Sequence, residues 1–85
     1  MRYFVYVLVS ESTGGRYIGQ TNDVARRLER HNSADRFGRR FTAKDVGPWK
    51  LVYTEEFASR KEAMARERWL KSGVGREWLD EKLSR

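Results

Sequence analysis

Two tyrosine-bearing apolar runs close to the N-terminus constrain the fold of this chain most strongly. Residues 3–9 are aromatic or β-branched almost throughout, and residues 16–20 form a second short run with a tyrosine of its own. The polar, glycine-containing stretch between them is typical of a turn, so the two runs predict a β-hairpin. Because the first run shows no clean alternation of apolar and polar residues, we expect it to lie in the centre of a sheet, covered on both faces.

Gly19 lies inside the second predicted strand. A glycine weakens a strand and usually marks either a β-bulge or a place where another group comes close to the backbone. The bulge is a purely structural interpretation, whereas the close approach would allow a substrate to reach the strand. Both interpretations stay open at this point.

A helix is predicted to follow the hairpin and to end at about His31. Thr21 and Asn22 are good N-cap residues for it. At about 100° per residue, Val24, Leu28 and His31 share one face of this helix. That face is expected to pack on the sheet.

Arg27 borders the same face one turn before His31, so the two side chains are neighbours. Arg26 and Arg30 point away from the face and are expected to be solvated. A single histidine beside an apolar face is ordinarily a hydrogen-bonded structural residue. An adjacent arginine also suits an anion-binding site, and the sequence leaves the two interpretations open.

The stretch from Asn32 to Gly47 is predicted to be a loop, because it has turn-forming residues and few apolar anchors. Basic residues alternate here with Phe37 and Phe41, a composition that suits stacking on bases and pairing with phosphates. The phenylalanines could instead anchor the loop on the core, as we expect for Phe41. The basic residues of this stretch that we expect to contact nucleic acid are Arg36, Arg39, Arg40 and Lys44.

The net charge favours a polyanionic partner. The 85 residues include 18 lysines and arginines against 12 aspartates and glutamates, a formal net charge of +6. Residues 22–44 contain seven basic and three acidic residues, so most of the excess positive charge lies in one stretch. Such a distribution indicates nucleic acid as a partner, although a solvated surface of mixed sign has a similar composition.

Residues 49–57 are predicted to form a third strand. Simple alternation puts Trp49, Leu51 and Tyr53 on one face and Val52 on the other. The end of this stretch is polar, so we expect it to be more exposed than its beginning.

Residues 59–62 read Ser-Arg-Lys-Glu, a capping box that marks the start of a second helix. Residues 72–75 are expected to end that helix, and a short last helix is expected from residue 76. On the second helix Ala63, Glu67 and Leu70 fall on one stripe.

Glu67 thus places a carboxylate where a small domain would ordinarily have a hydrocarbon side chain. An unpaired buried charge costs several kcal/mol, so Glu67 needs a partner. Arg27, a metal ion or a helix N-terminus could each serve, and so could a purely structural salt bridge.

The residue inventory narrows the chemistry. With one histidine and no cysteine, the chain lacks the residues for a thiolate site or for a zinc site built on several histidines. Two tyrosines, an arginine, a histidine and a carboxylate suit phosphodiester cleavage, which needs an oriented nucleophile and a stabilised phosphoryl charge. One carboxylate can hold a Mg²⁺-like cation that keeps most of its waters. A tyrosine, with an ordinary pKa near 10, needs a lowered pKa or a proton relay to act as a base.

The combined motifs resemble the GIY-YIG endonuclease superfamily over nearly the whole chain, from Tyr3 to about Leu79. The motifs are Phe4-Val5-Tyr6, Tyr17-Ile18-Gly19, Arg27-Leu28-x-x-His31 and Glu62-Ala63-Met64-x-x-Glu67-x-x-Leu70-Lys71. The chain is most similar to short, single-domain bacterial members related to the nuclease module at the N-terminus of the bacterial excinuclease. Each motif alone is weak, and their combination is specific.

The resemblance implies a small α+β fold, a three-stranded antiparallel sheet flanked by helices, and metal-dependent hydrolysis of nucleic-acid phosphodiesters, DNA in the first place. It implies Mg²⁺ or Mn²⁺ as cofactor, with Glu67 as metal ligand, and Arg27 as the residue that stabilises the scissile phosphate. It further implies Tyr6 as activator of the attacking water with His31 near it, Tyr17 as the second motif tyrosine, and Gly19 as the motif glycine. The catalytic set is therefore Tyr6, Tyr17, Arg27, His31 and Glu67.

The chain also departs from the family pattern. Its first motif reads Phe-Val-Tyr in place of Gly-Ile-Tyr, and no residue matches the asparagine that some members carry after the metal ligand. We see no separate specificity domain, and we therefore expect low sequence specificity, with Arg26 and Arg30 joining the loop residues in backbone contacts. A binding module of the same fold without catalysis is the alternative.

Residues 1–85 are expected to form one domain. The N-terminus has no small-residue cleavage site and no apolar run of about 18 residues, so we expect neither a signal peptide nor a membrane span. A cytoplasmic location is the corresponding expectation.

Overall fold

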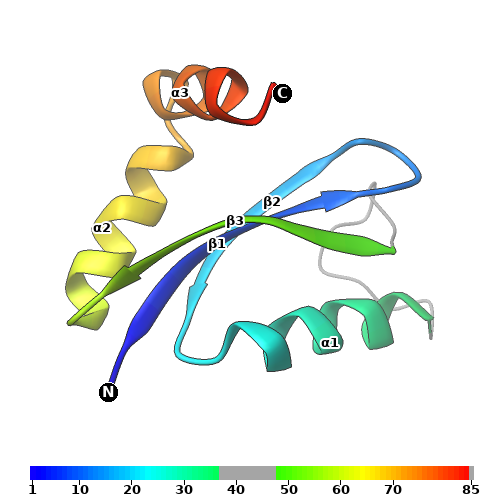
Figure 1. Cartoon of the computed structure of the whole chain (residues 1–85), viewed down its shortest axis with the longest axis horizontal. Coiled ribbons are helices and arrows are strands. Elements are labelled where there is room, and N and C mark those ends of the chain that lie inside the picture. The colour runs from blue at the N-terminus through cyan, green and yellow to red at the C-terminus, as the bar shows by residue number, and fades with distance from the viewer. Residues whose placement is uncertain (37–47, 85) are drawn as a thin grey trace.

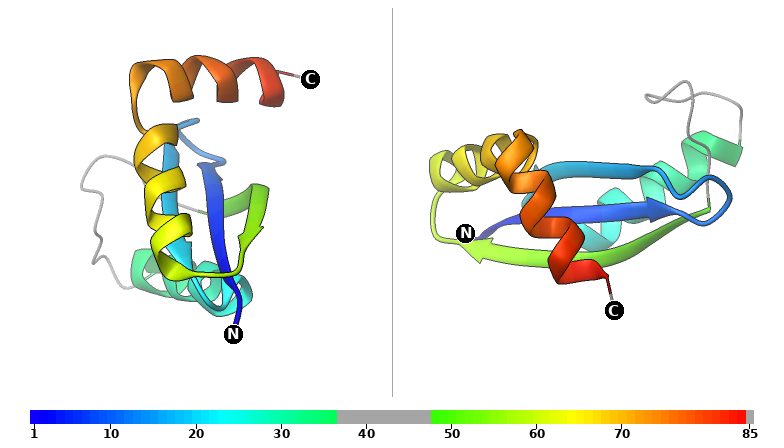
Figure 2. Two further views of the ribbon diagram at one scale, coloured as in Figure 1. Left: turned by 90° about the vertical axis from the view of Figure 1, so that its left-hand side faces the viewer. Right: turned by 90° about the horizontal axis from the view of Figure 1, so that it is seen from above.

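A three-stranded antiparallel sheet with helices on both faces organises the computed structural model, which describes residues 1–36 and 48–84 (Figures 1 and 2). Its elements are β1 (Tyr3–Ser10), β2 (Arg16–Thr21), α1 (Val24–Arg36), β3 (Trp49–Phe57), α2 (Arg60–Leu70) and α3 (Gly73–Leu83). The strand order is β2-β1-β3, with both pairings antiparallel. The predicted fold class and the central position of β1 are confirmed.

The side chains of β1 supply both halves of the core. Val5 and Val7 point to one face, where they pack with Leu70 of α2 and Leu79 of α3. Tyr6 and Leu8 point to the other face of the sheet, which α1 covers. All four consecutive positions from 5 to 8 are fully buried. This two-sided burial explains why the strand shows no alternation in its sequence.

A β-bulge in β3 divides that strand between the two faces. Val7 pairs with Tyr53 whereas Leu8 pairs with Leu51, so the register shifts at Val52. The extra residue turns Tyr53 to the α2 and α3 face, beside Val52, while Leu51 stays on the α1 face. The prediction that Tyr53 shares a face with Leu51 is therefore wrong, because strict alternation cannot anticipate a bulge.

Helix α1 continues to residue 36, beyond its predicted end at His31. The prediction of a loop from Asn32 is wrong for residues 32–36, since no glycine or proline interrupts the helix there. Instead of forming a turn, the side chain of Asn32 accepts a hydrogen bond from the Trp49 backbone N–H at 2.8 Å. This contact fixes the end of α1 against the start of β3. The predicted loop residues Phe37, Arg39, Arg40, Phe41 and Lys44 lie outside the described residues, as does the side chain of Arg36.

Serine side chains cap the two C-terminal helices. The Ser59 hydroxyl accepts from the Glu62 backbone N–H at 3.2 Å, as the capping-box motif predicts. Ser72 caps α3 in the same way, so this helix begins three residues before the predicted start. Gly75 makes the early start possible, because a Cβ there would lie 2.0 Å from the carbonyl oxygen of Trp69.

A mixed polar and aromatic cluster ties α2 and α3 to β3. Arg66 of α2 donates two hydrogen bonds to Glu55, at 2.9 and 3.0 Å. Its guanidinium also lies over Trp69 and over Trp78, at 4.5 and 5.0 Å from the ring centroids. The Tyr53 hydroxyl donates to the same Glu55 carboxylate.

Within residues 1–36 and 48–84, no helix has both the length and the apolar character that crossing a bilayer requires.

Candidate active site

The position of Gly19 opposite Tyr6 determines how the site is built. The two residues pair across β1 and β2 in a continuous register, without a bulge. A Cβ on Gly19 would lie 2.7 Å from the Tyr6 hydroxyl oxygen and 3.1 Å from the ring of Tyr17. Gly19 therefore leaves room for the Tyr6 ring to extend across β2. The bulge interpretation of this glycine is therefore wrong, and the group that lies close to its backbone in this structure is the Tyr6 side chain. The approach of a substrate to this strand stays a prediction.

Rings from three elements then pack around Tyr17. Tyr6 and Tyr17 stack with ring centroids 6.2 Å apart, and Tyr17 meets His31 edge to face at 4.5 Å. Trp49 of β3 closes the cluster at 6.0 Å from His31. His31 retains only 4% of its exposure, and its Nδ1 lies 3.0 Å from the Arg27 carbonyl oxygen. Sequence spacing on α1 thus places His31 inside an aromatic shell.

Burial shifts the titration of the two buried polar rings away from their charged forms. Desolvation lowers the pKa of His31, and the nearby charges of Arg27 and Arg30 lower it further, against a hydrogen bond to the Arg27 backbone. Desolvation raises the pKa of Tyr6 strongly, and the negative charge of Glu67 adds to that rise. At neutral pH the site therefore holds a neutral imidazole and a protonated Tyr6 phenol.

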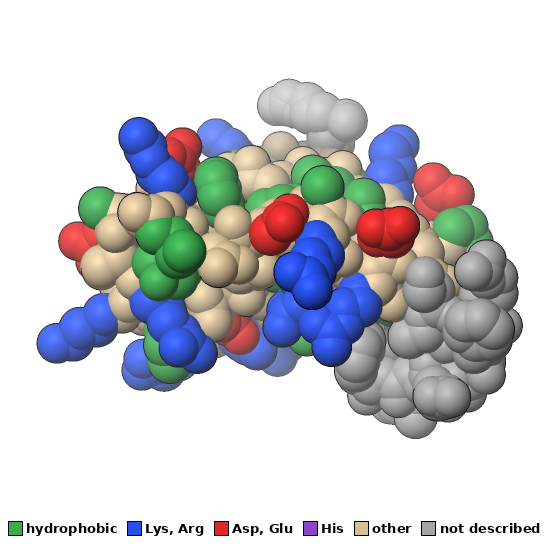
Figure 3. Space-filling view, turned by 90° about the horizontal axis from the view of Figure 1, so that it is seen from below, with side chains coloured by type: hydrophobic (Ala, Val, Ile, Leu, Met, Phe, Trp, Pro, Cys, Tyr) green, Lys and Arg blue, Asp and Glu red, His purple; other side chains and the backbone are tan. Residues whose placement is uncertain are grey.

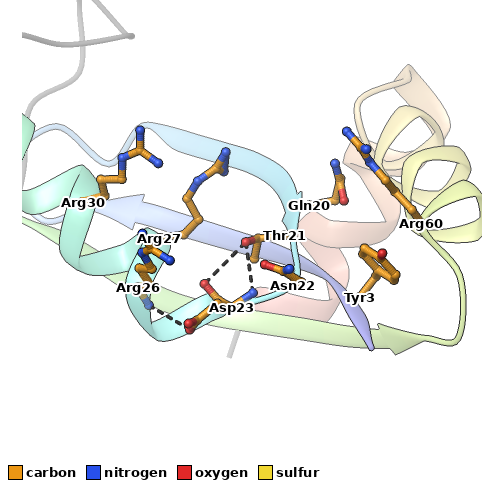
Figure 4. A pocket seen from close by; sticks show the side chains of 9 residues that line it. All are labelled: Tyr3, Gln20, Thr21, Asn22, Asp23, Arg26, Arg27, Arg30 and Arg60. Carbon is orange, nitrogen blue, oxygen red and sulfur yellow. Dashed lines mark hydrogen bonds between the residues drawn. The ribbon is translucent and has the colours of Figure 1, made fainter. Parts of the chain in front are cut away.

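Arg27 connects this cluster to the surface. Its Nη1 donates to the Tyr6 hydroxyl at 3.4 Å, and the rest of its side chain is half-buried. Its positive charge lowers the pKa of Tyr6, in opposition to the effect of burial. Arg27 also lines a surface pocket of about 400 Å³ next to the cluster, shown in Figure 4. One side chain thus reaches both the buried phenol and the solvent.

Glu67 lies on α2, and of the partners that the sequence left open the structure shows a salt bridge, with Lys71. The Lys71 ammonium donates to its carboxylate at 2.7 Å, one helical turn away, and the Glu67 side chain keeps 22% of its exposure. The carboxylate is therefore partly exposed and ion-paired. It still lies close enough to raise the pKa of Tyr6.

The structure thus brings four of the five expected catalytic side chains into one connected cluster and holds the fifth, Glu67, within electrostatic reach of it. These five side chains differ in their access to solvent. Tyr6 and His31 are buried, whereas Tyr17, Arg27 and Glu67 are half-buried. The buried pair forms a layer behind the accessible groups.

The expected backbone-binding residues on α1, Arg26 and Arg30, line the same pocket as Arg27. Figure 3 shows the molecule from the side on which α1 lies, and Lys and Arg side chains gather near the middle of that view. Three further lining residues, Tyr3, Gln20 and Arg60, were not anticipated from the sequence. Helical spacing offered a signal for Arg60, because it precedes Glu67 by seven residues and so shares its face of the helix.

The donor set near the cluster fits one kind of metal site. Among the described residues, no group of three or more histidine, aspartate or glutamate side chains converges to hold an ion. Asp23, the carboxylate of the pocket, already accepts the Arg26 backbone N–H at 3.1 Å as a helix cap. Glu67 therefore fits a hydrated cation held through a single carboxylate and does not fit a closed zinc site.

A match to known families agrees with this geometry. The family model described as the GIY-YIG catalytic domain matches residues 2–78. The chain belongs to the GIY-YIG family. This membership, expected from the motif combination, is confirmed.

Bacterial relatives of this GIY-YIG chain carry the name UPF0213. One from Streptococcus pneumoniae serotype 4 is 44% identical over 68 residues, which are 80% of this chain and 65% of that protein. The protein BH0048 of Halalkalibacterium halodurans is 41% identical over 69 residues, which are 81% of this chain and 66% of that protein. The chain thus spans just under two thirds of the length of these relatives.

One solved structure and one named endonuclease subunit are also similar. The solution NMR structure of the UPF0213 protein BH0048 from Bacillus halodurans matches with a TM-score of 0.53 and 38% identity, covering 93% of this chain and 82% of that one. The structure-specific endonuclease subunit slx1 of Aspergillus oryzae is 47% identical over 49 residues, which are 56% of this chain and 12% of that protein. A nuclease-family domain on the α+β fold is therefore established for this chain.

Proposed function

We propose that this chain is a divalent-metal-dependent endonuclease that hydrolyses phosphodiester bonds of nucleic acid, DNA in the first place, with little sequence specificity. The observation that carries the proposal is the convergence of side chains from four elements. Tyr6, Tyr17 and His31 contact one another, Arg27 donates to Tyr6, and Glu67 acts on the same phenol through its charge. A structural core has no need of this combination.

Arg27 is proposed to stabilise the phosphate under attack. Its guanidinium stands between the Tyr6 hydroxyl and the pocket, where a phosphate can reach it. A guanidinium keeps its charge at all relevant pH values and offers several N–H donors in a planar fork that matches phosphate oxygens. Negative charge that builds up on the phosphate during hydrolysis is thereby stabilised more than in the ground state.

Tyr6, Tyr17 and His31 are proposed to orient the attacking water and take up its proton. Because Tyr6 is protonated at neutral pH, it acts as a hydroxyl and not as a preformed phenolate. The Tyr6 and Tyr17 rings stack, and the Tyr17 ring in turn lies against the His31 imidazole. The lowered pKa of His31 keeps its imidazole neutral at neutral pH, and a neutral imidazole can accept the proton at the end of such a relay.

Glu67 is proposed to hold the cation, Mg²⁺ or Mn²⁺, in exchange for its ion pair with Lys71. When bound, the ion would offset phosphate charge. By neutralising Glu67 it would also remove that residue's part in raising the pKa of Tyr6, while burial, the main cause, would remain. Lys71 would then be released toward solvent, where an ammonium group is well hydrated.

Little sequence specificity follows from the kind of groups that the described residues present. Arg26, Arg27 and Arg30 lie on one helix and line a polar pocket. Guanidinium groups in such an arrangement fit phosphate oxygens, and phosphate contacts position a protein on nucleic acid without reading its sequence.

A second candidate is a binding module without catalysis. The Lys71 ion pair favours it, because this pair satisfies the Glu67 carboxylate without a metal. In this role Glu67 would hold no cation, and the site would be inactive.

Cleavage assays with purified protein separate the two candidates. The substrates are labelled single-stranded, duplex and branched DNA and RNA of one sequence, each with Mg²⁺, with Mn²⁺ or with EDTA. We expect cleavage with a divalent cation, its loss in EDTA, and its recovery when excess cation is added. Binding to the same substrates without cleavage under any condition would favour the binding module.

A further inference from the structure

The pocket beside the candidate active site has two walls that come from different helices. α1 supplies one wall, the first residue of α2 supplies the other, and the end of β2 lies between them (Figure 4). Its volume is about 400 Å³, which suits one phosphate group with its sugar and is far too small for a duplex. The lining residues are Tyr3, Gln20, Thr21, Asn22, Asp23, Arg26, Arg27, Arg30 and Arg60.

Positive charge accumulates in this pocket without a matching carboxylate. Four arginines line it, and none of them forms a salt bridge with any residue that the structure describes. The single acidic residue, Asp23, is engaged as the cap of α1 through the Arg26 backbone N–H. Because like charges repel one another, an anion bound between these arginines would stabilise the cluster.

Arg60 links the pocket to the candidate metal ligand. It begins α2, and Glu67 follows seven residues later on the same face of the helix. At 1.5 Å per residue, the two positions are about 10 Å apart along the helix axis. In Figure 4 the Arg60 side chain extends back along the pocket, and Gln20 lies between it and Arg27. The helix therefore separates Arg60 from the reaction centre by a fixed interval.

We infer that this pocket is a second phosphate subsite, which holds a backbone phosphate of the nucleic-acid strand next to the cleavage position. Arg60 contacts that phosphate from α2, while Arg26 and Arg30 line the opposite end of the pocket, on α1, along the path of the strand. Gln20 and Asn22 supply neutral donors at the floor. The inference rests on the proposed function for the choice of nucleic acid as the source of the phosphate. It adds the path of the strand, from the tyrosine cluster across the end of β2 to the start of α2.

Single-phosphate neutralisation tests this subsite without any need for cleavage. Affinities are measured in EDTA for single-stranded oligonucleotides that carry one neutral methylphosphonate at a defined position, which is moved along the strand. The proteins are the wild type, Arg60→Gln and Arg68→Gln. Arg68 is the matched control, since it is exposed on the same helix, outside the pocket, and pairs with no carboxylate of the described residues.

We expect one position at which the methylphosphonate weakens wild-type binding about tenfold and hardly affects Arg60→Gln, while Arg68→Gln behaves as the wild type does. We also expect the slope of log affinity against log salt to fall by about one in Arg60→Gln. Equal losses at every position in wild type and Arg60→Gln would overturn the inference, as would a failure of the wild type to bind any oligonucleotide. Coupling at one position in a protein that never cleaves would support the subsite and refute only the proposed catalysis.

Discussion

The two faces of the sheet differ in chemistry although one strand supplies both. On the α2 and α3 face, Val5 and Val7 pack among aliphatic side chains such as Leu70 and Leu79. On the α1 face, Tyr6 packs against Tyr17 and His31. Polar groups are thus buried at positions where hydrocarbon side chains would cost less free energy. The first face has the composition of a stabilising core. The second keeps buried phenol and imidazole groups at a cost that packing alone does not explain.

If this comparison is right, substitutions in the ring cluster, and of Arg27 and Glu67 beside it, should change activity. Substitutions among the aliphatic side chains beneath α2 and α3 should change stability. The test can fail in either direction, since a purely structural cluster would respond to substitution in the way the aliphatic core does.

The largest expected effect is that of Glu67→Ala. Its cleavage rate should fall at least a thousandfold, because a cation held at this carboxylate offsets transition-state charge by several kcal/mol. Binding of nucleic acid should stay equal or become tighter, since the carboxylate repels phosphate. Arg27→Ala, by contrast, should lose both cleavage and affinity. Cleavage rate, affinity and melting temperature are to be measured on the same samples. A folded Glu67→Ala protein that cleaves normally would refute the metal-ligand role.

Tyr6→Phe and Leu70→Ala compare the two faces directly. Both side chains are fully buried. Tyr6→Phe removes a hydroxyl that accepts from Arg27, and we expect cleavage to fall about 10²–10⁴-fold, with a stability loss of only about 1 kcal/mol. Leu70→Ala should cost about 2–5 kcal/mol of unfolding free energy and leave the activity of the folded fraction unchanged. Urea unfolding and initial cleavage rates measure the two quantities, and equal activity losses would contradict the division.

How far the sequence predicted this arrangement depends on the range of each interaction. Local signals worked well: the hairpin, the Ser59 cap and the helical spacing of Arg27 and His31 depend on neighbours in the chain. Contacts between distant elements were missed. The bulge at Val52 changes the face of Tyr53, and it becomes visible only when β3 pairs with β1.

The candidate site follows the same rule. The motif resemblance named its residues, but it gave no measure of their burial, and the raised pKa of Tyr6 follows from its burial in the assembled sheet. Lys71 as the partner of Glu67 was within reach of the sequence, since the pair is separated by one helical turn. The loop residues expected to contact nucleic acid lie outside the described residues and stay predictions.

Gly19→Ala tests how tightly the α1 face is fitted. The new methyl group would lie 2.7 Å from the Tyr6 hydroxyl oxygen, and a rigid ring cannot bend away from it. We expect a loss of about 1–3 kcal/mol in stability and a loss of activity comparable to that of Tyr6→Phe. Gly73→Ala is the control, because a Cβ at Gly73 meets nothing within 4 Å. If Gly19→Ala were as stable and active as the control, the close fit would be disproved by unfolding and rate measurements.

The smallest expected effect is a pH dependence of stability that originates on the α1 face. Burial lowers the pKa of His31 below its ordinary value near 6.5, helped by the charges of Arg27 and Arg30. In the window below 6.5 the unfolded chain therefore binds more protons at this position than the folded chain does. The contribution of His31 to stability is complete above pH 6.5 and is lost as the pH falls through its lower folded-state value.

Thermal or urea unfolding between pH 7.5 and 5 should record this loss, and His31→Gln should flatten it. Against the effect of burial, the Glu55 carboxylate also has a lowered pKa, through its hydrogen bonds with Arg66 and Tyr53. Because its ordinary value is 4.5, its effect on stability appears mainly below pH 5. The α2 and α3 face should accordingly contribute little slope between pH 7.5 and 5, and Glu55→Gln should keep the wild-type slope there. If His31→Gln kept the wild-type dependence of stability on pH, that dependence would originate from another group. The two faces of the sheet would then not differ in the way proposed.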